Sequence, residues 1–258
     1  MKVYKVSSYN VNGIRAAEKK GFSDWVKTEQ PDIICLQEIK ADETQIPEEI
    51  HALGYHSEWL SAEKKGYSGV AIMSKEKPLT SVKVMGLDWV DAEGRVLMFE
   101  YPEFKVYSVY APSGTSGDVR QTLKYQFLDA FYEFAHTEAQ KGKPVLFCGD
   151  INIAHREIDI HDPVRNKNSS GFLPEEREWF TRFLESGFHD VFRELHPDLK
   201  DVYSWWTYRA GAKGNNKGWR IDYHLATKEL ASKAQEGNIT RELNLSDHVP
   251  VTITYKFL

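Results

Sequence analysis

The stretch V-L-F-C-G-D-I-N-I-A-H, residues 145–155, decides how this chain can fold. Its first four residues, Val145 to Cys148, are apolar without a break, which is typical of a strand buried on both faces. Gly149 follows, and Asp150 and Asn152 then appear where the interior of a protein should be dry. Because an unpaired buried carboxylate is energetically costly, other groups at the end of this strand must compensate the charge of Asp150.

Strand-like runs of this kind recur along the chain, some alternating in polarity and others apolar throughout. Many strands in hairpin-like order, interrupted by helices, predict a mixed sheet or two packed sheets with helices outside. No linker or shift in composition marks a boundary, so we expect one catalytic domain over residues 1–258. The predicted strands are Val3–Tyr9, Asp32–Gln37, Tyr55–Leu60, Gly69–Ser74, Arg95–Tyr101, Lys105–Tyr110, Val145–Cys148, Trp219–Ala226 and Val249–Tyr255.

Three helices are predicted from apolar periodicity and capping signals. The first has an apolar residue at every fourth position from Val119 to Ala135, which predicts one buried stripe. The second opens at Pro174 and ends near Gly187, because proline favours a first turn and glycine a C-terminal cap. The third runs from Phe22 to about Glu29 and stops before Pro31.

The composition, 41% apolar and 28% charged in 258 residues, is that of an ordinary globular protein. No apolar run approaches the ~20 residues of a membrane span, and the N-terminus lacks the apolar core of a signal peptide. We therefore expect a cytoplasmic protein without a membrane partner, associated with the nucleoid if the source is bacterial. Cys35 and Cys148 lie in apolar runs and are expected to be buried reduced thiols rather than zinc ligands.

The net charge of −5 argues only weakly against a nucleic-acid partner. A site that gathers carboxylates around a cation would itself lower the total. The charge therefore excludes little.

Polar side chains stand at the ends of six predicted strands. Because side chains two apart on a strand share a face, Asp150 and Asn152 point one way while Ile151 and Ile153 point into the core. Any one such ending is explained by ordinary turn formation, but six would form one pocket if the strands share a sheet edge. The residues are Asn10, Asn12, Glu38, Tyr110, Asp150, Asn152, Asp222, Asp247 and His248.

This set of side chains suits one kind of chemistry. Oxygen ligands without cysteine favour a hard cation such as Mg²⁺, and a carboxylate beside a histidine favours the charged imidazole. Together with a tyrosine hydroxyl that can donate to developing charge, they predict metal-assisted attack of water on a phosphate ester. No segment matches a P-loop, a dinucleotide fingerprint or the G-x-S-x-G elbow.

Nine segments of the chain resemble, in order, the motifs of exonuclease III-type apurinic/apyrimidinic (AP) endonucleases, within the endonuclease/exonuclease/phosphatase superfamily. The resemblance implies a four-layer α/β sandwich of the DNase I-like type, with two packed mixed β-sheets flanked by helices. It implies Mg²⁺-dependent cleavage of duplex DNA 5′ to an abasic site, with trimming of blocked 3′ ends and 3′→5′ exonuclease activity. The segments are residues 10–16, 32–40, 65–71, 109–112, 148–159, 170–177, 203–209, 218–223 and 246–250.

The resemblance also implies roles for matching positions. Glu38 would be the principal Mg²⁺ ligand, with Asn10 close by and Lys40 steadying the carboxylate, and Mn²⁺ would substitute for Mg²⁺. Asp247 would lie near the metal. The implied metal-binding set is Asn10, Glu38, Asp150, Asn152, Asp247 and His248.

The implied catalytic residues form a second set. Asp150 would act on the attacking water, as general base or orienter, with Asn152 holding the same site. His248 would contact the scissile phosphate with Asp222 hydrogen-bonded behind it. Tyr110 would approach the phosphate or the leaving group. The residues alone leave open whether Asp150 or the Asp222–His248 pair is the base, since these groups titrate together.

DNA contacts are implied as well. Trp205, Trp219 and Ile221 resemble the apolar wall of the pocket that accepts a flipped abasic sugar, although each could equally be core. Flipping costs least where no base remains, which gives a physical reason for abasic selectivity. Contacts to DNA outside this wall are implied for Arg15, Tyr67, Arg120, Arg156, Asn166, Lys167, Arg209 and Lys217, although each cation alone could be an ordinary surface charge.

The chain departs from the family pattern at two positions. Ser113 follows Y-A-P where many relatives have Asn, and Ser169 stands in a run that is Asn-rich in relatives. These changes could tune the balance between endonuclease and exonuclease activity. His155 is expected to be structural, and His248 is the better catalytic candidate.

Two other functions remain open at this point. One is a nonspecific DNase I-like nuclease or a phosphatase of the same superfamily, against which the segments at 205–208 and 218–223 argue. The other is a noncatalytic DNA-binding module, against which the complete polar set argues. The partner expected is duplex DNA with abasic sites or blocked 3′ ends, bound by a monomer.

Overall fold

Two six-stranded sheets form the centre of the computed structural model, which describes residues 1–257. The first, sheet A, is mixed, because β1 pairs with one neighbour in parallel and with the other antiparallel. In order across the sheet its strands are β11 (Ala234–Ile239), β12 (Val251–Phe257), β1 (Lys2–Asn10), β2 (Ile33–Gln37), β4 (Val70–Ser74) and β3 (His56–Leu60).

The second sheet, sheet B, is mixed in the same way, since its two central strands are parallel and their neighbours antiparallel. In order across the sheet its strands are β5 (Thr80–Val82), β6 (Val96–Glu100), β7 (Lys105–Tyr110), β8 (Val145–Asp150), β10 (Asp222–Thr227) and β9 (Phe188–Asp190).

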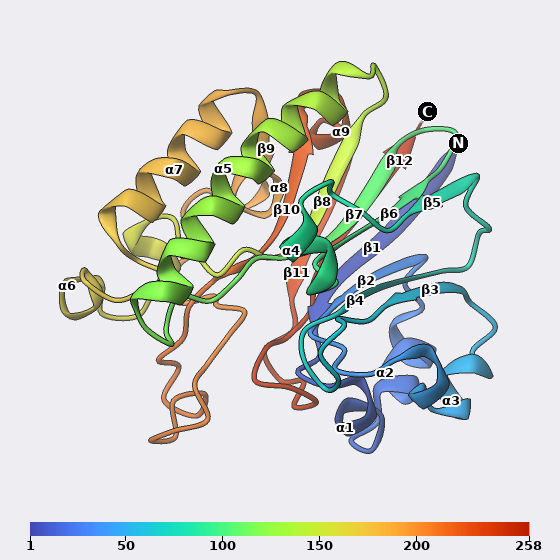
Figure 1. Cartoon of the computed structure of the whole chain (residues 1–258), viewed down its shortest axis with the longest axis horizontal. Coiled ribbons are helices and arrows are strands. Elements are labelled where there is room, and N and C mark those ends of the chain that lie inside the picture. Colours follow the sequence, from blue (N-terminus) through green and yellow to red (C-terminus); the bar gives the residue numbers. More distant parts are fainter. Residues whose placement is uncertain (258) are drawn as a thin grey trace.

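Helices cover the outer faces of both sheets (Figure 1). Sheet A carries α1 (Ile14–Glu18), α2 (Phe22–Glu29) and α3 (Glu48–His51), and sheet B carries α5 (Asp118–Gln140) and α7 (Pro174–Glu185). The predicted four-layer α/β sandwich is confirmed. The short connecting helices are α4 (Asp88–Ala92), α6 (Pro163–Asn166), α8 (Val191–Leu195) and α9 (Lys228–Ala231), with 3-10 turns at Glu43–Gln45 and Glu157–Asp159.

Strand β8, which contains the apolar run Val145 to Cys148, is buried on both faces. Leu146 and Cys148 pack into the core between the sheets, and Val145 and Phe147 pack against the helices over sheet B. The alternation continues past the strand, so Asp150 lies on the side that faces sheet A while Ile151 joins the helix side. The apolar run therefore indicated a central strand correctly, and the strand extends two residues beyond it.

Strand register brings the polar ends together. β7 and β8 are parallel, with Tyr110 opposite Asp150, and β10 is antiparallel to β8, with Asp222 opposite Asp150. The carboxyl ends of two strands and the amino end of a third therefore meet in one row of sheet B. In sheet A, β1 ends at Asn10 beside the same row, because Asn10 hydrogen-bonds Asp150.

Helix α5 is longer than its predicted stripe and turns a different face to the core. Val119 is 77% exposed, whereas Phe127, Phe131 and Ala135 are buried as predicted and Lys124 is buried as well. Residues four apart advance ~400° around a helix of 3.6 residues per turn, so a strict fourfold spacing rotates by ~40° at each step. The inclusion of Val119 in the buried stripe was therefore wrong.

Two further predictions can be compared with the fold. Cys35 and Cys148 are free and buried, as predicted. Within residues 1–257, no helix has the length and apolar character needed to cross a membrane.

Candidate active site

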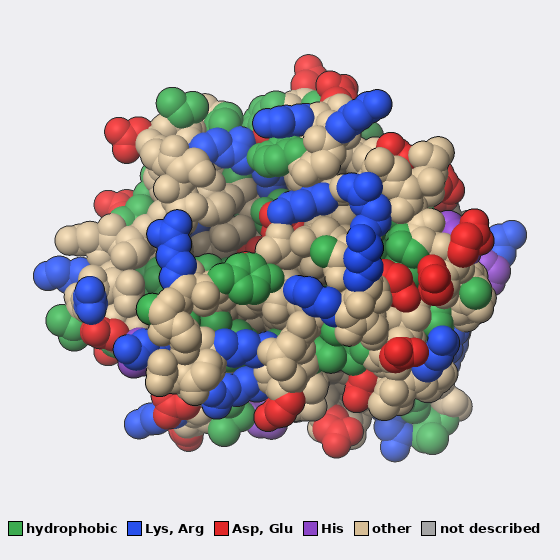
Figure 2. Space-filling model, turned by 90° about the horizontal axis from the view of Figure 1, so that it is seen from below, with side chains coloured by type: hydrophobic (Ala, Val, Ile, Leu, Met, Phe, Trp, Pro, Cys, Tyr) green, Lys and Arg blue, Asp and Glu red, His purple; other side chains and the backbone are tan. Residues whose placement is uncertain are grey.

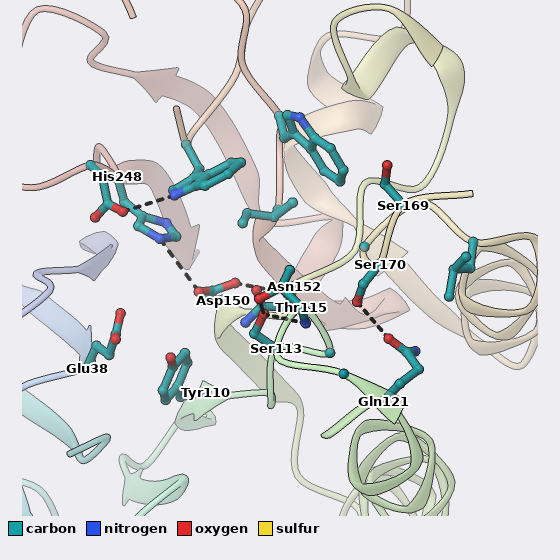
Figure 3. Close-up of a pocket in the computed structure, with 18 of the residues that line it drawn as sticks. Glu38, Tyr110, Ser113, Thr115, Gln121, Asp150, Asn152, Ser169, Ser170 and His248 are labelled. Atoms are coloured by element: carbon teal, nitrogen blue, oxygen red, sulfur yellow. Dashed lines mark hydrogen bonds and ion pairs between the residues drawn. The ribbon is translucent and has the colours of Figure 1, made fainter. Parts of the chain in front are cut away.

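A pocket of about 730 Å³ opens where the polar strand ends meet (Figure 3). Asp150 lies between Glu38 and His248 on one side and Ser169 and Ser170 on the other in this view. The pocket brings together most of the predicted catalytic and pocket-wall residues, with Asn10 and Asp222 buried directly behind them. The predicted residues that line it are Glu38, Tyr110, Asp150, Asn152, Trp205, Trp219, Ile221, Asp247 and His248.

Asp150 is held in one orientation from two directions. Its Oδ2 accepts a hydrogen bond from Asn10 Nδ2 at 3.0 Å, and its Oδ1 accepts one from the Asn152 backbone N–H at 2.9 Å. Burial, followed by the negative charge of Asp222, raises the pKa of Asp150 to about 7, and His248 opposes the rise. The carboxyl group can therefore exchange a proton near neutral pH.

His248 lies between two carboxylates. Its Nδ1 contacts Asp222 Oδ2 at 2.9 Å, and its Nε2 lies 3.8 Å from Asp150 Oδ2. Burial by itself lowers the pKa of the ring, but Asp222, Asp150 and Asp247 outweigh burial and raise the pKa to about 10. The ring is thus an imidazolium at neutral pH, with Nε2–H directed at the pocket side.

Ser204 is a residue that sequence reasoning missed. Its hydroxyl donates to Asp222 Oδ2 at 2.6 Å and accepts the backbone N–H groups of Ile221 and Asp222, each at 3.1 Å. The bond fixes the carboxylate that orients His248. The available signal was its place in the segment Y-S-W-W-T-Y-R, from which only Trp205 and Arg209 were predicted as site residues.

The loops of sheet A that reach the pocket have left-handed backbone at several non-glycine positions. Asn12, Glu38 and Ser68 have φ angles of 45°, 55° and 49°. Backbone hydrogen bonds hold these turns together, including Gly13 N–H to Glu38 O at 2.7 Å and Lys40 N–H to Ser68 O at 2.9 Å. Such conformations cost free energy and persist only where surrounding structure enforces them, often at functional sites.

A line of side-chain contacts leads from Glu38 to the apolar wall. Lys40 Nζ lies 3.2 Å from Glu38 Oε1, as predicted, and donates to Asn12 Oδ1 at 2.6 Å. Asn12 Nδ2 donates to Asp247 Oδ1 at 3.0 Å, and Trp205 Nε1 donates to Asp247 Oδ2 at 3.1 Å. Asp247 therefore connects the candidate metal ligand to the pocket wall, and both its oxygens are engaged.

Tyr110 ends β7 with its ring under the Arg95 guanidinium, whose Cζ lies 4.8 Å from the ring centroid. Arg95, another residue that sequence reasoning missed, also donates to Tyr110 O at 2.8 Å. Burial, followed by the charges of Glu38 and Asp150, raises the pKa of the phenol well above its usual range. The hydroxyl group therefore stays protonated and can donate a hydrogen bond.

The donor set fits a hard divalent cation. Carboxylate oxygens of Asp150 and Asp222 and a ring nitrogen of His248 all lie within 4.8 Å of one another. Because the His248 ring is protonated at neutral pH, the two carboxylates are the ligands that this cluster offers. Among residues 1–257, Asp222 Oδ1 is buried without a hydrogen-bond partner, and an unpaired buried carboxylate oxygen is costly unless a cation or water meets it. The Glu38 side chain is 20% exposed and lines the same pocket. Sequence reasoning placed Asp222 only behind His248 and missed it as a possible ligand.

The apolar wall consists of Trp205, Trp219 and Ile221. The two indole rings meet edge to face, with centroids 6.0 Å apart, and pack with Ile160 and Phe172 in a small separate cluster. Gly171, at φ +94°, lets the chain pass close to Trp219, since a Cβ there would come within 3.0 Å of the ring. These three residues therefore both pack and line the pocket.

A second pocket of about 430 Å³ adjoins the first and shares Tyr110 and Ser113 with it. Arg120 lies here, with one guanidinium nitrogen on the Tyr67 hydroxyl at 2.8 Å and another on Glu93 at 3.1 Å. Figure 2 shows Lys and Arg side chains around a hollow on this end of the molecule. Cationic side chains therefore surround this hollow although the chain as a whole carries a net charge of −5.

Other predicted DNA contacts lie outside these pockets. Arg156 lines a separate pocket between α7 and α8, and the Asn166 side chain donates to the carbonyls of His161 and Asp162. His155 contacts Thr181 and stacks on Phe180, and burial lowers its pKa to about 4, in keeping with the structural role expected. The remaining residues of the predicted set are exposed outside the pockets: Arg15, Lys167, Arg209 and Lys217.

The two departures from the family pattern lie on the pocket rim. Ser113 and Ser169 both line the main pocket. The Ser113 hydroxyl lies 2.9 Å from Thr115 Oγ1, so it is engaged within its own loop.

Comparison with known proteins gives consistent matches. A model described as the endonuclease/exonuclease/phosphatase family matches residues 7–248. The chain is 44% identical to an exodeoxyribonuclease of Bacillus subtilis, covering 96% of this chain and 98% of the relative. A solved AP endonuclease from Archaeoglobus fulgidus superposes with a TM-score of 0.90 at 30% identity, covering 98% and 100% of the two chains. A solved 3′ phosphatase from Neisseria, bound to a product DNA hairpin, superposes with a TM-score of 0.91 at 28% identity and the same coverage.

Proposed function

The chain belongs to the endonuclease/exonuclease/phosphatase family, and from this premise we propose that it is a DNA-repair nuclease. It hydrolyses the phosphodiester 5′ to an abasic site in duplex DNA, trims blocked 3′ ends and removes nucleotides 3′→5′. The observation that carries the proposal is one pocket in which Glu38, Asp150 and His248 face an apolar wall.

Asp150 prepares the attacking water. Asn10 and the Asn152 N–H occupy one lone pair on each carboxylate oxygen, so the carboxylate presents its remaining lone pairs in a fixed direction. Its pKa of about 7 allows it to take the proton of water near neutral pH. The imidazolium form of His248 argues against the Asp222–His248 pair as the base, because that ring already carries its proton.

His248 and Tyr110 act on the phosphate. The His248 ring, held by Asp222, presents a charged N–H donor to the phosphate oxygens, and charge-assisted donors are the stronger kind. Tyr110 presents a neutral hydroxyl from the adjacent strand. Both donors are placed before the reaction by buried partners, which is the condition for stabilising charge that develops in a transition state.

The cation that fits this set is Mg²⁺, with Mn²⁺ as a substitute. Glu38 is the proposed principal ligand, with Asn10, Asp150, Asn152, Asp247 and His248 as the other proposed members of its surroundings. A bound divalent cation neutralises charge on the phosphate oxygens. Lys40 fixes the Glu38 carboxylate from the side of Asn12.

The substrate is recognised by shape and by charge. Trp205, Trp219 and Ile221 offer an apolar surface to a sugar without a base, and Arg120 and Tyr67 offer donors to the DNA backbone in the adjoining pocket. We further propose that the chain acts as one catalytic domain and as a monomer, because the residues that line the proposed active site already form a complete pocket. We also propose a cytoplasmic location.

The deciding experiment compares three duplexes under one condition. Purified protein with Mg²⁺ is expected to nick a duplex that carries one abasic analogue, to release a 3′-terminal phosphate, and to stop when EDTA is added. A control duplex without damage should be cut far more slowly. An abasic duplex left intact by excess enzyme over hours would overturn the proposal, and equal cutting of undamaged duplex would favour a nonspecific nuclease.

Asp150→Asn separates catalysis from binding in the same assay. The amide keeps the shape of the side chain but cannot take a proton, so the cleavage rate should fall by ~10²–10⁴-fold. DNA affinity, measured by fluorescence anisotropy, should change little. A noncatalytic DNA-binding protein would show no cleavage in either form.

A further inference from the structure

Lys124 and Glu176 form an ion pair in which neither side chain is exposed to solvent. Lys124 Nζ in α5 lies 2.5 Å from Glu176 Oε1 in α7, and both side chains are 0% exposed. A buried ion pair is costly to desolvate, and apolar side chains of similar volume often hold two helices together equally well. The pair therefore calls for an explanation other than helix packing.

The lysine reaches past the pair to a residue of the pocket. Lys124 Nζ donates a second hydrogen bond, of 2.7 Å, to the backbone carbonyl of Asn152. Asn152 has a left-handed φ of 56°, its N–H binds Asp150 Oδ1, and its Nδ2 donates to Ala111 O at 2.9 Å. Lys124 thus fixes the backbone carbonyl of the same residue whose backbone N–H holds the proposed base.

The glutamate holds the opposite side of the pocket. Its Oε2 accepts the backbone N–H groups of Gly171 at 2.6 Å and Leu173 at 3.0 Å. These residues belong to the segment 168–173, which lines the pocket and is called here the serine wall. The same carboxylate therefore connects the serine wall to Lys124.

Gln121 extends the network to the rim. Its Nε2 donates to Glu176 Oε1 at 2.9 Å, and its Oε1 accepts the Ser170 hydroxyl at 2.7 Å, as Figure 3 shows for Ser170. Gly114, before α5, lies so close that an added Cβ would be 1.8 Å from Gln121 Oε1. Gln121 therefore fixes the distance between the loop at Gly114 and the serine wall.

We propose that Lys124, Glu176 and Gln121 are positioning residues for phosphodiester hydrolysis. Lys124 sets the orientation of the Asn152 peptide and with it the Asp150 carboxylate, while Gln121 and Glu176 set the width of the pocket at the serine wall. The inference rests on the proposed nuclease function. It assigns to Lys124 an effect on the rate of hydrolysis and to Gln121 and Glu176 an effect on how the substrate fits the pocket.

Two variants test these effects on the rate and on substrate binding separately. Lys124→Met/Glu176→Gln removes both charges at similar volume, and the glutamine oxygen can still accept the Gly171 and Leu173 N–H groups. The new amide nitrogen can donate to Gln121 once the Gln121 amide turns over, because the Ser170 hydroxyl can accept from Gln121 Nε2 as well as donate to Gln121 Oε1. The donor to the Asn152 carbonyl is then the contact that has no replacement. Because a displacement of ~1 Å in a catalytic group can cost ~10²-fold, kcat on the abasic duplex should fall about 10- to 100-fold with KM nearly unchanged.

Gln121→Leu should have the opposite signature. Gln121 is half-buried, so the variant is expected to fold, and it frees Ser170 without touching the Lys124 bond to Asn152. KM should rise several-fold while kcat stays within about twofold, since the Asp150 side of the pocket is unchanged.

A matched control exists at the other end of the same helix. Lys105 and Glu138 form a second buried pair, 2.9 Å apart, and Glu138 lies 14 residues beyond Lys124, ~20 Å along the axis of α5. Lys105→Met/Glu138→Gln should lower the melting temperature without changing kcat or KM. If the Lys124–Glu176 pair were purely structural, its variant would behave in the same way. Unchanged kcat and KM in the site variants would therefore overturn the inference.

The remaining outcomes are also decisive. Both site variants could instead show a lower kcat together with a higher KM, in proportion to their loss of stability. That result would contradict separate effects on the rate and on substrate binding. If the Lys124→Met/Glu176→Gln protein does not fold, Gln121→Leu alone decides, and unchanged KM overturns the inference. A wild-type protein that leaves the abasic duplex intact would overturn the proposed function itself, and the inference with it.

Discussion

At the scale of single residues, one imidazole between two carboxylates determines the charge of the site. Asp222 binds His248 Nδ1 at 2.9 Å, and Asp150 lies 3.8 Å from Nε2. The negative charge of Asp222 raises the pKa of both neighbours, that of Asp150 by repulsion and that of His248 by attraction. Near neutral pH the His248 ring therefore keeps its proton, while the Asp150 carboxyl group can gain or lose one.

Asp222→Asn should move the alkaline limit of activity. In the wild type the pKa of His248 is about 10, so the ring keeps its positive charge through pH 8–9. Asparagine removes the largest factor that raises this pKa, and burial alone pulls it below the ordinary value of about 6.5. With increasing pH, kcat/KM rises as Asp150 loses its proton. In the variant kcat/KM would fall again at a lower pH than in the wild type, because the imidazolium loses its proton earlier. The alkaline limb of the pH–rate profile should shift down by two or more pH units, on the order of that change in pKa.

Asp247→Asn is the matched comparison for this shift. Asp247 also raises the pKa of His248, but more weakly than Asp222, and its side chain makes no hydrogen bond to the ring. The alkaline limb of the pH–rate profile should move much less in Asp247→Asn than in Asp222→Asn. Equal shifts in the two variants, or none, would show that hydrogen bonding by Asp222 does not set the charge of the ring.

The types of residue in the site could be predicted from the sequence, because the chemistry restricts them. The hydrogen bonds between these residues and distant segments could not be predicted. The sequence placed Glu38, Asp150 and His248 as site residues from strand ends and family motifs. It offered no sign that the Ser204 hydroxyl would hold Asp222 at 2.6 Å, 18 positions away, since hydroxyl-to-carboxylate bonds between distant segments follow no spacing rule.

At the scale of elements, β8 positions Asp150 because its backbone lies tightly against β7. Gly149 is the point of closest approach, and a Cβ there would lie 1.8 Å from the Val109 carbonyl oxygen. This close contact explains why residue 149 is a glycine, since no side chain fits between the two strands. The conformation is ordinary otherwise, as Gly149 has no left-handed φ.

Gly149→Ala should therefore separate β7 from β8 and displace Asp150. Forcing a methyl group into backbone contact is expected to cost about 3 kcal/mol in the free energy of unfolding, and the cleavage rate should fall along with it. Urea unfolding with an unchanged m-value measures the first effect. Gly214→Ala is the control, because its nearest neighbour would be 3.6 Å from the new Cβ; a similar loss in both variants would refute the close-contact argument.

Elements with strong local patterns were predictable, and elements made by pairing were not. Helix α2 was predicted from Phe22 to about Glu29, ending before Pro31, and the structure has it at Phe22–Glu29. The edge strands β5, β9 and β11 were missed. Strand β11 reads A-Q-E-G-N-I and is defined by its hydrogen bonds to β12 rather than by its own alternation, and edge strands depend on context more than on propensity.

At the scale of the whole molecule, the site exists because two sheets end at the same place. Asn10 from sheet A and Asp150 from sheet B are 140 positions apart and 3.0 Å apart in space. The sequence predicted that polar strand ends would converge, but the meeting of ends from opposite sheets required the family resemblance. The Lys and Arg side chains around the hollow in Figure 2 were not predictable from a net charge of −5, because a sum over the chain does not say where its charges lie.

The contact between the two sheets also makes stability depend on pH. His224 of β10 in sheet B is fully buried, and its Nε2 lies 3.0 Å from the Val251 carbonyl of β12 in sheet A. Because a carbonyl oxygen only accepts, Nε2 carries the proton, and Nδ1 accepts from the Tyr255 hydroxyl at 3.0 Å. Burial lowers the pKa of this histidine from 6.5 to about 4, so the ring is neutral in the fold and has no room for a second proton.

The unfolded chain takes up that proton first as the pH falls, which determines the sign of the effect. The contribution of His224 to stability is complete above pH ~6.5 and is lost progressively toward pH 4, by about 3 kcal/mol in total. Urea unfolding from pH 7.5 to 4 should show this loss in the wild type. His224→Gln, which can still donate to Val251, should be less stable at pH 7.5 yet approach the wild type as the pH falls. Parallel curves for the two proteins would mean that protonation of this cross-sheet histidine does not drive acid unfolding.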